Sequence, residues 1–149
     1  MISITQQQTL DIDWFFIADD KIGFVASGGG KLPESVAFLD EKTEIISSYF
    51  RNLPEKTTVI INEKLKEIKN TTVNEKYLSD FLYMAKRGLY AFDKSSLNDF
   101  SNLIYHLVAR PQKHLSIEEL PTEIINLINK TTYNSSLNIT ETISIDDIK

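Results

Sequence analysis

The 149-residue sequence has no cysteine and only two histidines, His106 and His114. The lack of cysteine excludes disulfides, thiolate nucleophiles and zinc–thiolate sites. The histidines stand eight residues apart around a proline, which is not the spacing of a known metal motif. We therefore expect no metal site, and we expect His106 to be a half-buried, hydrogen-bonded residue of a strand.

Long apolar runs and export signals are also missing. No stretch approaches the roughly 20 apolar residues that span a bilayer. Residues 1–8 have neither the basic residues nor the apolar segment of a secretory signal. These absences, together with the lack of cysteine, predict a cytoplasmic protein that does not bind membranes.

The sequence contains no known catalytic or nucleotide-binding motif. It lacks His-Glu-x-x-His and Gly-x-Ser-x-Gly, and the three glycines at 28–30 belong to neither a phosphate loop nor a dinucleotide fingerprint. Its paired acids, at 19–20, 118–119 and 146–147, resemble turn or helix-start residues more than a general acid and base. We expect no catalytic residue and no cofactor.

The most informative stretch that is present runs from Ile12 to Pro33 and predicts a β-hairpin. Ile12, Trp14 and Phe16 share one parity, as in a strand with a buried face, and this favours a core position for Trp14. A polar turn at 19–21 separates this strand from a second apolar run at 22–26. Apolar residues on the opposite parity indicate that the first strand is covered on both faces, as in a central strand. Residues 28–30 then suit a loop with positive φ angles.

Helices are predicted from apolar spacing and capping residues. A stripe at positions 45, 46, 49, 50 and 53 indicates a helix that begins near Asp40 and ends before Pro54. Thr72 and Glu75 form a capping box for a helix over about 73–87, whose apolar face we expect to cover the hairpin, and Gly88 suits its left-handed end. Further helix starts are offered by Pro33, Ser116 and Pro121. Residues 1–9 are expected to be loosely ordered.

The remaining apolar segments predict strands at 57–62, 89–92, 103–109 and 137–145. For Leu103–Ala109 a helix is the alternative, because its apolar residues also fit a 3.6-residue period. Its β-prone residues and the following Arg110-Pro111 favour a strand. The whole chain, 1–149, is predicted to be one α+β domain, a mostly antiparallel sheet packed against two or three helices.

Charge is unevenly distributed along the chain, whose net charge is −5. Residues 11–44 contain eight acids and three lysines, whereas residues 51–94 carry a net +3 and residues 95–149 a net −3. An acidic surface repels nucleic acid and attracts basic partners, so the acidic segment predicts binding to a basic protein and not to nucleic acid. An acidic face that only aids solubility is the alternative.

The hairpin resembles one family. Trp14-Phe15, the acidic turn, the Gly-x-x-Ala pattern of residues 23–26 and Ser27-Gly28-Gly29-Gly30 before Pro33 are similar to immunity proteins of bacterial polymorphic toxin systems. The resemblance continues at residues 86–90, 105–111 and 117–121, and so spans most of the chain. It implies a non-enzymatic protein that binds and blocks a cognate toxin stoichiometrically.

These observations lead to a predicted partner-binding surface. It comprises the turn Asp19, Asp20 and Lys21, the loop Ser27, Gly28, Gly29, Gly30 and Lys31, and Glu34. The alternative function is a small-ligand-binding or regulatory domain with a pocket beside the Gly28–Gly30 loop. An enzyme of unknown chemistry has the least support.

Overall fold

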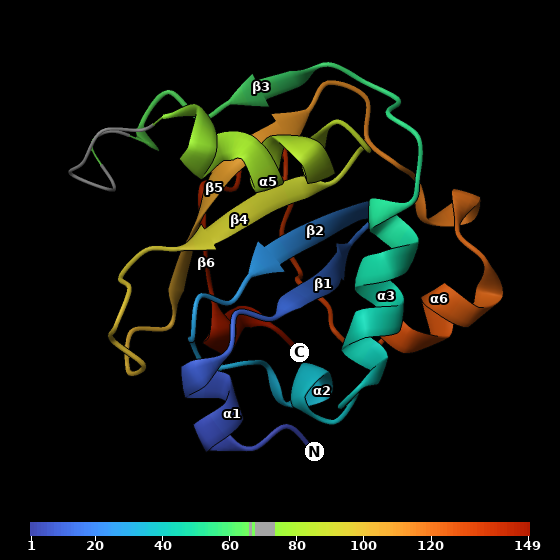
Figure 1. Ribbon diagram of the computed structural model, residues 1–149. Helices are drawn as coiled ribbons and strands as arrows, with labels where there is room; N and C mark the ends of the chain where they lie inside the picture. The colour runs from blue at the N-terminus through green and yellow to red at the C-terminus, as the bar shows by residue number, and fades with distance from the viewer. Residues whose placement is uncertain (66, 68–73) are drawn as a thin grey trace.

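The computed structural model describes residues 1–65, 67 and 74–149, and in this part of the chain helices surround one curled sheet (Figure 1). The strands are β1 (Asp13–Ala18), β2 (Lys21–Ala26), β3 (Val59–Ile61), β4 (Tyr90–Lys94), β5 (Ile104–Pro111) and β6 (Thr142–Ser144). They are ordered β1-β2-β4-β5-β3, and β6 pairs with the other half of β5. Among these six strands, β2 and β4 pair in parallel, and the other pairs are antiparallel. The predicted α+β fold with a mostly antiparallel sheet is confirmed.

The helices begin at residues that suit their first turns. They are α1 (Ile4–Thr9), α2 (Glu34–Ala37), α3 (Lys42–Arg51), α5 (Glu75–Ala85) and α6 (Thr122–Ile128), with 3-10 turns at Ile117–Glu119 and Ile145–Asp147. The side chain of Asn74 caps α5 by accepting from the Tyr77 amide, whereas the predicted cap Thr72 lies outside the described residues. Gly88 follows this helix with φ +99°, as predicted. Among the described residues, no helix combines the length and apolar character that crossing a membrane requires.

One face of the sheet is covered by α3, α5 and α6. The Phe15 ring of β1 packs on Phe50 of α3, with 4.6 Å between ring centroids. The α5 helix lies over β4 and β5 and reaches the hairpin through Phe24 and Phe81, whose ring centroids are 6.2 Å apart. The prediction that α5 covers the hairpin is therefore only partly right, because α3 covers β1.

The opposite face is covered by the N-terminal segment, α2 and the C-terminal chain. Trp14 is 1% exposed in this second core, as predicted. The prediction that residues 1–9 are loosely ordered is wrong. Ser3 and Gln6 form a capping box at the start of α1, and Ile2 is buried. The buried Gln7 amide accepts from the Leu32 amide at 3.0 Å, which ties α1 to the chain after the hairpin.

Strand β1 lies at the end of the sheet, so its predicted central position is wrong. Its side chains are nevertheless buried on both faces because a core lies on each side of the sheet. Backbone bonds from Ile17 to Thr131 and from Tyr133 to Ile17, each 2.9 Å, also cover part of its outer edge. Burial on both faces of a strand therefore shows that both sides of the sheet are covered. It does not show that the strand is central in the sheet.

The C-terminal half tests two strand predictions. Residues 104–111 form the long strand β5, which confirms the strand prediction for Leu103–Ala109. The predicted strand over 137–145 is mostly wrong, because only Thr142–Ser144 pair with β5. Leu137 is buried before that strand, whereas Ile139 is 82% exposed. The apolar residues of this segment are therefore buried or exposed one by one in an irregular chain and do not form the face of one long strand.

Candidate functional site

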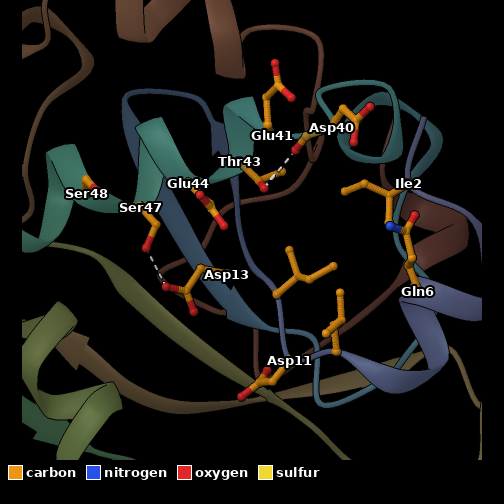
Figure 2. Close-up of a pocket in the computed structure, with 12 residues that line it drawn as sticks. Ile2, Gln6, Asp11, Asp13, Asp40, Glu41, Thr43, Glu44, Ser47 and Ser48 are labelled. Atoms are coloured by element: carbon orange, nitrogen blue, oxygen red, sulfur yellow. Dashed lines mark hydrogen bonds between the residues drawn. The ribbon is translucent and has the colours of Figure 1, made fainter.

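A cavity of about 540 Å³ opens between α1, the start of β1 and α3 (Figure 2). Its lining includes five carboxylates, Asp11, Asp13, Asp40, Glu41 and Glu44. No lysine or arginine is among the described residues that line it. We call this concavity the acidic cleft. The apolar part of its lining comes from Ile2, Leu10 and Ile12.

The acids of α3 stand at the start of that helix. Asp40 adopts φ +52°, a conformation that aspartate tolerates, and its carbonyl accepts from the Thr43 hydroxyl at 3.0 Å. Glu41 is the N-cap residue and Glu44 lies in the first turn. Acidic side chains are favourable there because the helix N-terminus carries a partial positive charge. The same electrostatics that begin the helix therefore place three exposed carboxylates beside the cleft.

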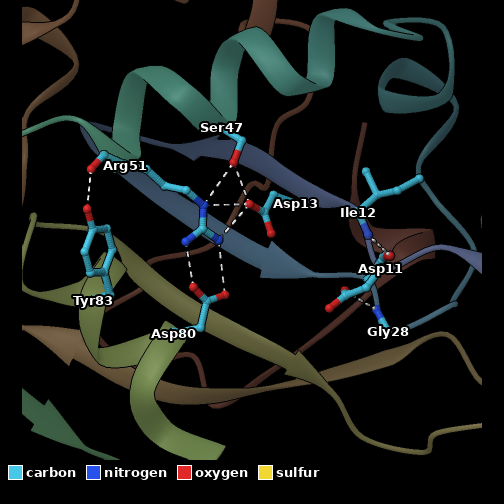
Figure 3. A network of polar contacts seen from close by, with 9 residues as sticks. Asp11, Ile12, Asp13, Gly28, Ser47, Arg51, Asp80 and Tyr83 are labelled. Carbon is cyan, nitrogen blue, oxygen red and sulfur yellow. Dashed lines mark hydrogen bonds and ion pairs between the residues drawn. The ribbon is translucent and has the colours of Figure 1, made fainter.

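Asp13 is the most firmly held acid of the cleft (Figure 3). Its Oδ2 atom accepts from the Ser47 hydroxyl at 2.5 Å and from Arg51 Nε and Nη2 at 3.0 and 2.8 Å. Arg51 also makes two bonds to Asp80 of α5, at 2.6 and 3.1 Å. The Asp80 bonds, and then those of Asp13, raise the pKa of Arg51. Two carboxylates thus share this cation, which leaves the acids at the start of α3 outside its ion pairs.

Asp11 connects the cleft to the glycine loop. Its Oδ1 atom accepts from the Gly28 amide at 2.9 Å. Gly28 and Gly29 have φ angles of +54° and +76°, which confirms the prediction of positive φ angles in this loop. A Cβ atom on Gly30 would lie 2.5 Å from the Tyr105 hydroxyl, so this glycine is packed against the protein. The Gly28 amide thus holds Asp11, which lines the cleft, whereas the glycines themselves are not lining residues.

The structure separates the residues predicted to form one binding surface. Asp19, Asp20 and Lys21 lie at the β1–β2 turn, whereas Ser27 to Lys31 follow β2 at the opposite end of the hairpin (Figure 1). Glu34 begins α2 and is exposed. None of these residues lines the acidic cleft. The cleft carboxylates come from the same acidic segment, 11–44, but sequence reasoning did not single them out.

Asp20 has a structural role. Its carboxylate accepts from the Ser116 hydroxyl at 2.6 Å and from the Ile117 amide at 3.3 Å, and it lies 3.1 Å from His114 Nε2. The Ser116 bond, and then the His114 bond, lower the pKa of Asp20. The acid therefore fastens the hairpin turn to the segment that follows β5.

A second polar cluster lies inside the protein. His106 is 0% exposed, and its Nδ1 atom lies 3.0 Å from the Ser95 hydroxyl. The Tyr77 hydroxyl donates to Asp93 at 2.7 Å, and burial, followed by the Asp93 charge, raises the pKa of Tyr77. The prediction that His106 is a hydrogen-bonded strand residue is right, although the residue is fully rather than half buried.

Neither the acidic cleft nor the buried polar cluster contains a set of metal ligands among the described residues. Over residues 1–65, 67 and 74–149, no three histidines or carboxylates are grouped closely enough to hold a metal ion. The acids of the cleft come from two parts of its wall, the start of β1 and the start of α3. The functional proposal rests on this geometry, because comparisons of the chain with protein-family models, curated proteins and solved structures found no match.

Proposed function

We propose that this chain is a non-enzymatic binding module that blocks a basic protein partner, and that the acidic cleft is its contact surface. The main support for this proposal is that five carboxylates line one concavity. No basic side chain is among the described residues that line it. The resemblance of the hairpin to bacterial immunity proteins supports a toxin as the partner. Blocking then occurs by occlusion, since a bound module covers the basic active site of the toxin.

The cleft acids divide into two kinds with different roles in binding. Asp40, Glu41 and Glu44 are exposed, so they act at a distance and raise the rate of association with a basic partner. Asp13 is only 19% exposed and is held in place by Arg51 and Ser47. A partner cation that reaches Asp13 meets a preorganised carboxylate, and this contact slows dissociation.

The test compares two variants that lose the same charge. The cleft variant carries Asp40→Asn, Glu41→Gln and Glu44→Gln, and the control carries Asp19→Asn, Glu34→Gln and Glu118→Gln. Both replace an aspartate at positive φ by asparagine, which also tolerates that conformation. The partner to assay is a toxin sought in the neighbouring reading frame, and association rates are measured at two ionic strengths.

We expect the cleft variant to associate on the order of tenfold more slowly at low salt, with a weaker salt dependence. The control should keep the rate of the unmodified protein within about a factor of two. In co-expression with the toxin, the cleft variant should protect cells less well than the control variant does. Equal rates and equal protection for both variants would remove the cleft from the mechanism.

A small cationic ligand is the second candidate. A volume of about 540 Å³ lies within the range of small-molecule sites, and apolar residues beside carboxylates suit an aliphatic polyamine. Titration with spermidine tests this function by thermal unfolding. A saturable rise in Tm that the cleft variant loses would support the ligand, and no rise would leave the protein partner as the function.

A further inference from the structure

Over the part of the chain that the structure describes, the outer edge of β3 is an open, apolar strand edge. The strand order ends at β3, so among the described strands none pairs with its outer side (Figure 1). Ile60 and Ile61 are 46% and 40% exposed. The stretch from Thr57 to Asn62 contains no charged residue and no proline, which are common means of protecting an edge from pairing.

The hydrogen-bonding pattern shows which backbone groups face outward. The Gln112 amide donates to the Thr58 carbonyl, and the Asn62 amide donates to the Val108 carbonyl. Because antiparallel pairing alternates, residues 58, 60 and 62 face β5, and Val59 and Ile61 direct their N–H and C=O groups away from it. Pro111 stands opposite Val59, at a position from which this pattern needs no N–H toward β3.

We propose that β3 pairs antiparallel with β3 of a second copy, around a two-fold axis at Ile60. In this register Val59 lies opposite Ile61 of the other copy, and their outward groups form hydrogen-bonded pairs on both sides of the axis. Each Ile60 side chain then meets its own counterpart on one face of the joined sheet. The outward N–H and C=O groups of β3 in one copy therefore match those of β3 in the other copy.

The second copy fits this edge better than a charged partner does. The flanking residues Thr57, Thr58 and Asn62 are neutral, so the edge has no charge to recognise a basic protein. Pairing also leaves the proposed function unaffected, because β1 and α3 of the acidic cleft lie at the opposite end of the strand order. A dimer of this kind presents two open clefts.

The strength of the contact follows from its size. A three-residue strand adds a small interface, and small interfaces are weak and transient. We expect monomers at low concentration and dimers at a protein concentration on the order of 100 µM. Sedimentation equilibrium over a concentration series measures this association.

Substitutions at Ile60 test the register as well as the surface. Ile60→Lys and Ile60→Glu each place like charges opposite one another across the axis, so each variant alone should be monomeric. An equal mixture of the two, with the Ile60→Glu variant uniformly labelled with heavy nitrogen, should form a heterodimer, which native mass spectrometry then separates from either homodimer by mass. Ile45→Lys, at a 56% exposed position of α3, is the matched control and should dimerise like the unmodified chain.

Amide hydrogen exchange gives an independent measurement on the unmodified protein. Protection of the Val59 and Ile61 amides should grow with protein concentration, because pairing covers these outward groups. If circular dichroism showed that the Ile60 variants fail to fold, this measurement would decide alone. A chain that stays monomeric at about 1 mM, a mixture without heterodimer from folded variants, or concentration-independent exchange would overturn the proposal.

Discussion

Gly23 lies opposite Phe16 in the β1–β2 ladder, and the Phe16 ring covers the place of a side chain at Gly23. A Cβ atom at Gly23 would stand 2.2 Å from that ring, far inside van der Waals contact. Phe16 is 0% exposed and also packs on Phe92, with 5.7 Å between ring centroids. The glycine therefore makes room for an aromatic ring at the centre of the second core.

Gly23→Ala should lower the free energy of unfolding by about 1–3 kcal/mol, because the added methyl overpacks a rigid core. Urea titration measures the loss. The double variant with Phe16→Leu should lose less than the sum of the two single changes, since the smaller side chain removes the clash. Additive losses would show that the ring does not oppose the methyl group.

Phe81→Ala should lower the free energy of unfolding by about 3–5 kcal/mol, because Phe81 is 6% exposed and packs on Phe24 and Tyr77. Ile45→Ala is the control on an exposed helix position, where the change should stay within about 0.5 kcal/mol. Both are measured by urea titration. A loss below about 1 kcal/mol for Phe81→Ala would contradict the packing of α5 on the sheet.

The lowered pKa of Asp20 predicts a pH dependence of stability. Since Ser116 and His114 favour the charged carboxylate in the folded protein, Asp20 contributes stability above its ordinary pKa of 3.8. That contribution is lost as the pH falls from 3.8 through the lower value in the fold. Asp20→Asn should therefore reduce stability at neutral pH and lessen its fall in acid.

Unfolding titrations at neutral pH and at about pH 3 measure this difference. Asp19→Asn is the control, because it changes the neighbouring acid of the same turn and leaves the bonds of Asp20 in place. Parallel pH profiles for Asp20→Asn and the unmodified protein would contradict the prediction.

The sequence predicts elements well where the pattern is local. Trp14 and Phe16 on one parity and Phe15 on the other describe the two buried faces of β1, because alternation is a property of the strand itself. The α3 stripe is predicted with one exception, Ile45, which is 56% exposed. The stripe is wider than the face that the sheet covers, and only the packing of the helix decides which edge of it stays in solvent.

The cleft depends on contacts that no local pattern encodes. Asp13 and Arg51 are separated by the whole glycine loop and α2, yet they meet because α3 packs on β1. The acidic segment 11–44 was recognisable by charge alone. The predicted binding surface draws on the turn and the loop because these contain polar residues and glycines, whereas Asp40, Glu41 and Glu44 also fit an ordinary helix start.

The parallel pairing of β2 with β4 has a consequence for the order of folding. The β1–β2 hairpin and the β4–β5 pair each join strands that are near in sequence, whereas Gly23 pairs with Tyr90 across the long intervening segment 24–89. Closing so long a loop costs entropy before its contacts form, so we expect this pairing to form late. During synthesis the hairpin can form early, but its interior edge stays open until β4 leaves the ribosome.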